Sequence, residues 1–170
     1  MTRSLLHQLQ LTLPDHISLA RGSLLDSDAD ALVNTVNTVG VMGAGIAKAF
    51  RDRYPEMYRG YRARCRRGLV QTGKIDVHIV TELHGARLVM NFPTKQDWRY
   101  PSRLEWIDQG LPELRRLAES LPSMRSIAIP SLGCGHGGLD WSTVLPRIVE
   151  TFRDLESVRV EIYSPATYSS

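Results

Sequence analysis

The sequence predicts an α/β fold in which a mixed central sheet is covered by helices on both faces. Short β-rich runs alternate along the chain with amphipathic helical segments, which is the pattern of layered α/β domains. Two glycine-rich loops each follow a short buried run and lead into a helix. A length of 170 residues suits one domain. We therefore expect a single domain over residues 1–170, with a core at about 8–164 and short tails.

The first third of the chain alternates strands, a loop and helices. Residues 8–13 (QLQLTL) have period-two alternation, and residues 16–20 form a second strand that could pair with them as a hairpin. Residues 31–34 (ALVN) are typical of a buried central strand. A loop at 35–45 precedes a helix at 46–54. Pro55 interrupts that helix, and residues 56–66 resume it with most arginines on the outer face.

The rest of the chain continues the alternation. Residues 75–80 and 87–92 form an adjacent strand pair, and a loop follows at 93–101. Ser102 and Glu105 have capping-box spacing, so a helix should run from there to about residue 120. A buried strand at 126–130 leads into the loop at 131–139. Asp140 or Ser142 caps a helix to about 154, which Pro146 would distort beyond its first turn. A strand at 158–163 ends in a frayed tail.

Composition excludes several classes of protein. No apolar run approaches the ~20 residues that span a bilayer, and the N-terminus lacks the apolar stretch of a signal peptide. Cys65 and Cys134 are too few for a disulfide framework or a four-cysteine metal site. We therefore expect a cytoplasmic protein with reduced thiols, without a membrane partner, bound metal or cofactor.

The net charge of +3 is unevenly distributed. Residues 48–67 hold eight cations and two anions, a charge of +6, and the other 150 residues sum to −3. As a binding footprint, this basic segment would attract the phosphates of a nucleic acid. As an ordinary outer helix face, it would only be solvated, and both interpretations remain open.

Three loops lie where α/β sheets bind ligands, beyond the carboxyl ends of strands: 35–45, 93–101 and 131–139. The first has glycines whose spacing fits neither a Rossmann motif nor a P-loop. Its position before a helix still suits a diphosphate. The carboxamides of Asn34 and Asn37 could bind ribose hydroxyls or cap loop backbone groups.

Two further side chains in these loops are candidate nucleophiles. The Lys95 amine could attack a carbonyl or a sugar C1, or it could be a solvated surface charge. Cys134 would need a base such as His136, two residues away, and a packing role suits it better.

Several motifs resemble those of macrodomains. The run DALVNTVN at 30–37, with GVMGAGIA after it, resembles their first ligand loop, and PSLGCG at 130–135 resembles their phosphate loop. The combination of NTVNTVGVMGAGIA, NFPTK and SLGCGHGGLDW is similar to DarG-type macrodomains, antitoxins that remove ADP-ribose from DNA. It is also similar to the human terminal ADP-ribose glycohydrolase branch. The resemblance covers nearly the whole chain.

This resemblance implies a pocket for ADP-ribose with Lys95 as the catalytic lysine and Asn37 beside the distal ribose. The implied ligand-binding residues are Gly22, Ser23, Leu24, Asn34, Thr38, Gly40, Val41, Met42, Gly43, Gly45, Ser131, Leu132, Gly133, Cys134 and Gly135. His136 and Asp140 are further catalytic candidates. Two positions depart from the family pattern: Ser23 stands where many macrodomains have an adenine-binding Asp, and Asp140 is not clearly matched to the branch's acid.

The function implied is hydrolysis of ADP-ribose from nucleobases of single-stranded DNA, which reverses a DNA ADP-ribosyltransferase toxin. The alternatives are a non-catalytic ADP-ribose-binding module, and a hydrolase acting on ADP-ribosylated protein carboxylates or O-acetyl-ADP-ribose. We expect a monomer. The cognate toxin would be a partner only if the chain belongs to a longer antitoxin, because nothing in it corresponds to a toxin-binding region.

Overall fold

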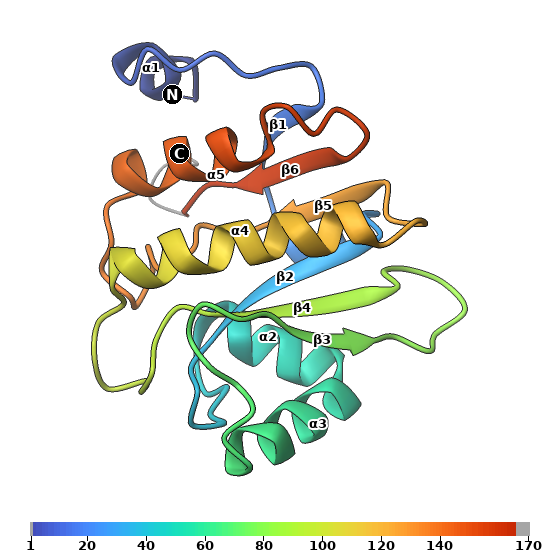
Figure 1. Cartoon of the computed structure of the whole chain (residues 1–170). Coiled ribbons are helices and arrows are strands. Elements are labelled where there is room, and N and C mark those ends of the chain that lie inside the picture. The colour runs from blue at the N-terminus through green and yellow to red at the C-terminus, as the bar shows by residue number, and fades with distance from the viewer. Residues whose placement is uncertain (1, 166–170) are drawn as a thin grey trace.

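A computed structural model describes residues 2–165 and shows a six-stranded mixed sheet (Figure 1). The strand order is β1-β6-β5-β2-β4-β3, and only β3 is antiparallel to its neighbour. The strands are β1 (Ile17–Ala20), β2 (Ala31–Val36), β3 (Asp76–Ile79), β4 (Leu88–Pro93), β5 (Ser126–Ile129) and β6 (Arg159–Tyr163). This topology confirms the predicted α/β class, and the antiparallel pair of β3 and β4 confirms the predicted strand pair.

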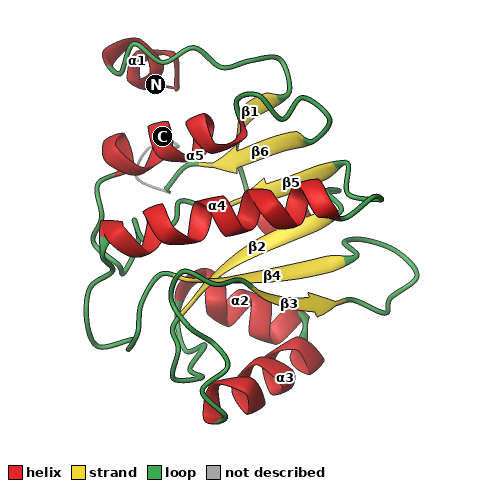
Figure 2. Cartoon of the chain, viewed as in Figure 1, coloured by secondary structure: helices red, strands yellow, loops and turns green. Residues whose placement is uncertain are grey.

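Helices cover both faces of the sheet (Figure 2). They are α1 (Thr2–Gln8), α2 (Gly45–Arg53), α3 (Pro55–Arg66), α4 (Leu104–Ser120) and α5 (Trp141–Phe152), with a short 3-10 turn at Leu24–Asp26. Pro55 occupies the first turn of α3, which separates α2 from α3 as predicted. No helix within residues 2–165 is long and apolar enough to cross a membrane.

Two apolar cores explain the layers. Along β2, Val33 belongs to the core under α4 and α5, whereas its neighbour Leu32 belongs to the core under α2 and α3. Side chains that alternate between faces can both be buried only when each face is covered. Phe50, Met57 and Tyr61 fill the second core from α2 and α3, which confirms the apolar face predicted for these helices.

The predicted N-terminal hairpin is wrong. Gln8 ends α1, a turn follows at residues 9–10, and no strand forms over 8–13. The leucines of this segment, Leu9, Leu11 and Leu13, pack against the core from irregular backbone. Their alternation therefore reflects burial without sheet pairing. The strand at 17–20 pairs instead with β6, in parallel.

The two predicted helix caps have opposite outcomes. Helix α4 begins at Leu104 with Arg103 at the cap position, so the Ser102 capping box is wrong. The Ser102 backbone N–H donates instead to the carbonyl of Gly137 at 3.0 Å. Asp140 does cap α5, because its Oδ1 accepts from the Ser142 backbone N–H at 3.0 Å.

The C-terminal helix and tail differ in detail from the prediction. Helix α5 runs through Pro146 to Phe152. The strand predicted at 158–163 is confirmed as β6, whose last residue, Tyr163, pairs with Ala20. Residues 166–170 of the predicted tail lie outside the described residues.

Candidate functional site

A cavity of about 1230 Å³ opens beyond the carboxyl ends of the parallel strands. Its walls come from the loops after β2, β4 and β5, which are the three loops singled out in the sequence. The segment at 22–25 and the residues at 163–165 close the remaining side. Parallel strands end at one edge of the sheet, and this shared edge brings together loops far apart in the sequence.

The structure brings together most of the predicted site residues. Those lining the cavity are Gly22, Ser23, Leu24, Asn37, Val41, Gly43, Gly45, Lys95, Ser131, Gly133, Gly135 and His136. The others do not line it: Asn34, Thr38, Gly40, Met42, Leu132, Cys134 and Asp140. Several of this second group lie behind the lining and shape the loops that carry it.

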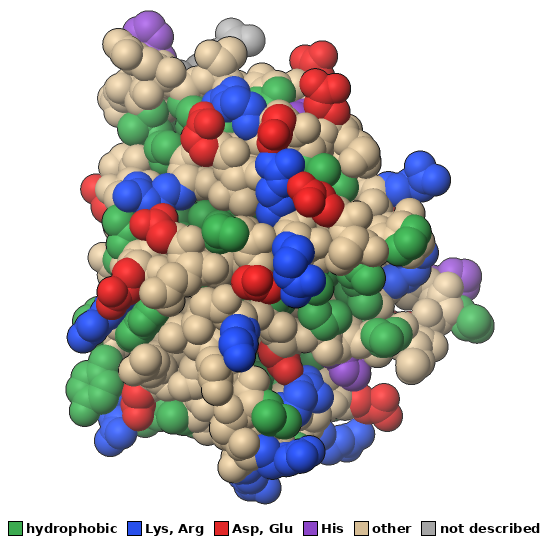
Figure 3. Space-filling model, in the orientation of Figure 1, with side chains coloured by type: hydrophobic (Ala, Val, Ile, Leu, Met, Phe, Trp, Pro, Cys, Tyr) green, Lys and Arg blue, Asp and Glu red, His purple; other side chains and the backbone are tan. Residues whose placement is uncertain are grey.

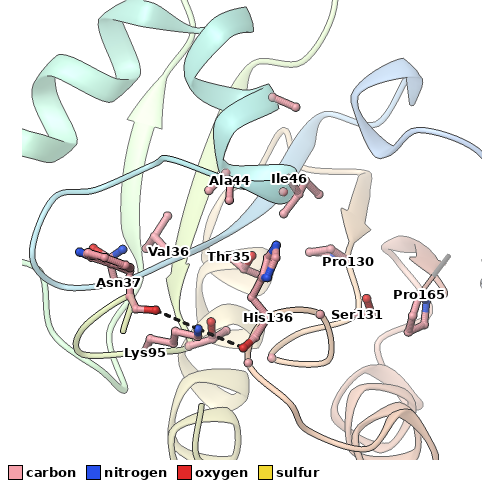
Figure 4. A pocket seen from close by; sticks show the side chains of 18 of the residues that line it. Thr35, Val36, Asn37, Ala44, Ile46, Lys95, Pro130, Ser131, His136 and Pro165 are labelled. Atoms are coloured by element: carbon pink, nitrogen blue, oxygen red, sulfur yellow. Dashed lines mark hydrogen bonds between the residues drawn. The ribbon is translucent and has the colours of Figure 1, made fainter. Parts of the chain in front are cut away.

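Lys95 reaches across the cavity wall from the loop after β4 (Figure 4). Its Nζ donates to the backbone carbonyls of Trp98 at 3.3 Å and His136 at 3.1 Å. The two carbonyls fix the position of the amine between two loops. A lysine amine held on the wall of a ligand cavity is within reach of an electrophile bound there.

Asn37 organises the first loop. Its Oδ1 accepts from the backbone N–H groups of Val39, Gly40 and Val41 at 3.1–3.2 Å, and its Nδ2 donates to the Val41 carbonyl at 2.8 Å. The sequence-based interpretation that this side chain caps loop backbone groups is confirmed. The second hydrogen of Nδ2 can donate a hydrogen bond to a ligand in the cavity.

Tyr61 secures Asn37 from below. Its buried hydroxyl lies 2.7 Å from the Asn37 carbonyl and 3.0 Å from Asn37 Oδ1, and it donates to these oxygens. Burial raises the pKa of Tyr61 well above its usual value, so the hydroxyl stays protonated and remains a donor.

Asn34 lies beneath the site in a buried polar chain. Its Nδ2 donates to Asn91 Oδ1 at 3.2 Å, and Asn91 Nδ2 donates to Asp76 Oδ2 at 3.0 Å. Arg64 of α3 completes the chain with two hydrogen bonds to the Asp76 carboxylate. Asn34 is therefore placed to link strands rather than to face the cavity.

Two glycine-bearing segments face each other across the cavity. Gly45 begins α2 at a φ of +57°, and the backbone N–H groups at a helix N-terminus suit an anion. The opposite segment includes Gly133, at a φ of +73°. The His136 imidazole reaches between them, because a Cβ at Gly45 would lie 3.5 Å from its Cδ2 (Figure 4).

Two candidate catalytic residues, Cys134 and Asp140, do not line the cavity. Cys134 is half-buried, and burial, with a smaller effect of Asp140, raises the pKa of its thiol to about 12. A thiol that stays protonated is a poor nucleophile, which supports the packing role. The Asp140 side chain accepts hydrogen bonds from Ser142 and caps α5.

Sequence reasoning missed part of the lining. The missed residues include Thr35, Ala44, Ile46, Ala47, Ala49, Thr94, Arg99, Tyr100, Pro101, Gly137, Gly138, Tyr163, Ser164 and Pro165. Two aromatic residues in a polar loop, Trp98 and Tyr100, were a usable signal. The β6 end carried none, because Tyr163 continues an ordinary strand pattern.

The basic segment at 48–67 is largely ion-paired. Lys48 and Arg51 contact Asp52, and Arg59 contacts Glu56 within the segment. Two further ion pairs involve carboxylates from elsewhere in the chain: Arg53 binds Glu82, and Arg64 binds Asp76. Adding these two carboxylates lowers the local charge from +6 to +4.

The unpaired remainder of that segment is small. Within residues 2–165, no ion pair joins Arg62, Arg66 or Arg67 to a carboxylate, and all three are exposed. Figure 3 shows basic side chains gathered at the lower end of the molecule, where Figure 1 draws α3. A nucleic-acid footprint on this helix would depend on these three arginines.

The fold and the cavity define a class of protein. The profile of the Macro domain family matches residues 33–148, which run from β2 into α5 and contain all three loops. The chain belongs to the macrodomain family. This result confirms the fold and the family expected from the loop motifs.

Within this family the chain is similar to macrodomains of DarG proteins. It is 49% identical over 150 residues to the DNA ADP-ribosyl glycohydrolase of Mycobacterium tuberculosis, which covers 88% of this chain and 42% of that protein. The Thermus aquaticus protein of the same name is 47% identical, with 88% and 41% covered. The chain thus spans about two fifths of the length of these curated relatives.

Solved structures agree with these relationships. The macrodomain of Mycobacterium tuberculosis DarG matches with a TM-score of 0.86, over 88% of this chain and 98% of that one. Thermosipho africanus DarTG, solved in complex with ADP-ribose, is 31% identical with a TM-score of 0.83, over 92% of this chain and 43% of that one. The resemblance to DarG-type macrodomains is confirmed.

Proposed function

We propose that this protein is an ADP-ribosyl glycohydrolase that removes ADP-ribose from a nucleobase of single-stranded DNA. The observation that carries the proposal is the position of Lys95, held on the cavity wall by two carbonyls from different parts of the chain. The relatives named as DNA ADP-ribosyl glycohydrolases support the choice of substrate. By this activity the protein would reverse a DNA ADP-ribosyltransferase toxin.

The cavity has a suitable environment for each part of ADP-ribose. Leu24, Leu25 and Tyr163 offer apolar surface for the adenine at one end. The start of α2 and the loop at 131–135 offer backbone N–H groups for the diphosphate. Asn37 and Lys95 lie on the wall that would receive the distal ribose.

The reaction can proceed through a covalent intermediate on Lys95. The uncharged Nζ attacks C1 of the distal ribose while the bond from C1 to the base nitrogen breaks. One Nζ proton passes to the departing base. The bond between C1 and the ring oxygen then breaks as the second Nζ proton passes to that oxygen, and the ring-opened sugar stays attached to the lysine as an imine. Water then adds to the imine and releases ADP-ribose and the free amine. Asn37 orients the ribose throughout.

The finer biological setting belongs to the same proposal. We propose that the protein acts as a monomer in the cytoplasm, where Cys65 and Cys134 stay reduced. A cognate toxin is its partner if the chain forms part of a longer antitoxin. Pairing of that kind is consistent with the Thermosipho africanus fusion protein, which joins a DNA ADP-ribosyl transferase to a glycohydrolase.

A side-by-side release assay tests the proposal. Wild-type protein is incubated with ADP-ribosylated single-stranded DNA and with a peptide ADP-ribosylated on glutamate, and free ADP-ribose is measured. We expect release from the DNA and a loss of about 10²-fold or more in kcat for Lys95→Ala. Lys74→Ala is the matched control, because Lys74 is an exposed lysine away from the cavity.

Three results would contradict the proposal. Full activity of Lys95→Ala on modified DNA would remove the lysine mechanism. Faster release from modified glutamate than from DNA would favour a carboxylate hydrolase. Calorimetric binding of ADP-ribose without turnover of either substrate would favour a non-catalytic module.

A further inference from the structure

Two large aromatic side chains stand exposed at the mouth of the cavity. Trp98 and Tyr100 are 56% and 62% exposed, although both also line the cavity. They follow Lys95 by three and five residues, and the Trp98 carbonyl accepts from Lys95 Nζ. Exposed aromatic rings beside a ligand cavity are candidates for contact with what extends out of it.

Cations lie beside the Tyr100 ring and beside Trp106 in the helix that follows the loop. The Arg99 guanidinium lies 5.7 Å from the centre of the Tyr100 ring, and the Arg103 guanidinium lies 5.5 Å from that of Trp106. Residues 95–105 contain three cations and two carboxylates, a local charge of +1, and Arg103 pairs with Glu105 at 3.2 Å. Aromatic faces among positive charges match the bases and phosphates of a single strand.

The loop that carries the rings is held in place. The Asp97 carboxylate accepts two hydrogen bonds from the Arg99 guanidinium, at 3.0 and 2.8 Å. The Gln96 carbonyl accepts from the Thr38 backbone N–H and hydroxyl, at 3.2 and 2.9 Å. The backbone of the loop is therefore already ordered before a base stacks on its rings, which lowers the entropy cost of binding.

We infer that Trp98 and Tyr100 form a stacking platform for the nucleobases that flank the ADP-ribosylated nucleotide in single-stranded DNA. This inference rests on the proposed function and specifies how the DNA strand is held. The Trp98 carbonyl accepts from Lys95 Nζ, so a base stacked on the Trp98 ring lies close to the amine. Stacking therefore also brings the modified nucleotide to Lys95. Stacking tolerates any sequence, because every base has a flat face.

The test compares two substrates that differ only in their flanking nucleotides. One is an ADP-ribosylated mononucleoside, and the other is a single-stranded oligonucleotide with the same modified base at its centre. We expect wild-type kcat/KM to be higher on the oligonucleotide. Trp98→Ala combined with Tyr100→Ala should reduce this advantage about tenfold or more, and Trp98→Phe should preserve most of it.

Controls separate stacking from general damage. Leu83→Ala removes another large side chain, 95% exposed in the β3–β4 connection, and should leave the ratio of the two kcat/KM values unchanged. Circular dichroism melting should show that the aromatic variants fold. Quenching of tryptophan fluorescence by unmodified single-stranded DNA should fall markedly in Trp98→Phe, because Trp141 is buried and Trp106 is only partly exposed and does not line the cavity.

The outcomes distinguish the inference from the function on which it rests. If the wild-type protein releases ADP-ribose from neither substrate, the proposed function fails. If it acts on both and the double alanine variant loses kcat/KM equally on both, the platform is overturned. Unchanged activity of that variant on both substrates also overturns it.

Discussion

The Lys95 amine donates to the backbone carbonyl of His136 over 3.1 Å, which joins two loops separated by 41 residues. One loop follows β4 and the other follows β5, and β2 lies between these strands in the sheet. The bond therefore spans the carboxyl edge of the sheet above β2. It places a candidate nucleophile beside the loop organised by Asn37, since the Thr38 hydroxyl of that loop donates to the Gln96 carbonyl.

Tyr61→Phe should lower kcat without abolishing the binding of ADP-ribose. The change removes the hydroxyl that donates to Asn37 and leaves a buried acceptor unpaired, at a cost of about 1–2 kcal/mol in the free energy of unfolding. We expect kcat to fall about tenfold and the calorimetric Kd for ADP-ribose to rise less. Tyr58→Phe is the control, because its hydroxyl makes only a 3.5 Å contact with Gly40. Equal effects of both variants would contradict the role of Tyr61.

Cys134→Ala should leave the pH dependence of kcat/KM unchanged. Burial raises the pKa of this thiol to about 12, so it stays protonated across the range from about pH 6 to 10. No thiolate forms in that range, and no inflection of the profile can arise from this residue. A profile measured for wild type and variant should superimpose. Loss of an alkaline inflection in the variant would show that the thiol takes part.

Gly110→Ala should destabilise the protein. A Cβ at this position would lie 2.3 Å from Cζ of the buried Phe92. The clash should outweigh the helix-propensity gain of about 1 kcal/mol and cost about 1–3 kcal/mol net in the free energy of unfolding. Urea denaturation measures the change, and Gln109→Ala on the exposed side of α4 is the control. A Gly110→Ala protein as stable as the wild type would refute this packing.

Charge reversal on α3 should separate a DNA footprint from a solvated helix face. Arg62→Glu with Arg66→Glu and Arg67→Glu changes the three exposed arginines of the basic segment and preserves the Arg64–Asp76 pair. If this face contacts phosphates, KM for modified oligonucleotides should rise and its salt dependence should flatten. Equal KM values for the variant and the wild type from low to high salt would leave the face merely solvated.

The sequence predicted the location of the site better than its detailed contacts. The three loops were recognisable because glycines, asparagines and a lone lysine follow short apolar runs, and parallel strands bring such loops to one edge. The roles of Asn34 and Asn37 could not be separated in this way. Both are carboxamides three residues apart, and only the alternation along β2 and the turn after it place one beneath the cavity and the other on its wall.

The errors have physical causes. Leu9, Leu11 and Leu13 alternate as in a strand, yet they pack against the core from the turn and irregular segment after α1 and pair with no strand. Ser102 has the spacing of a helix cap, but its backbone N–H is already engaged by Gly137. In both places a tertiary contact outweighed a local pattern, and no local pattern reports such a contact.

Main-chain atoms supply many of the bonds that frame the cavity. The carbonyl of Gln96 holds Thr38, that of Gly137 holds Ser102, and that of His136 holds Lys95. A backbone carbonyl is present whichever side chain the residue bears. Gln96 and His136 can therefore each be replaced by other residues without loss of these hydrogen bonds. Substitutions at such positions can alter which adduct the protein accepts while its scaffold persists, which gives this architecture a route to diverge in specificity.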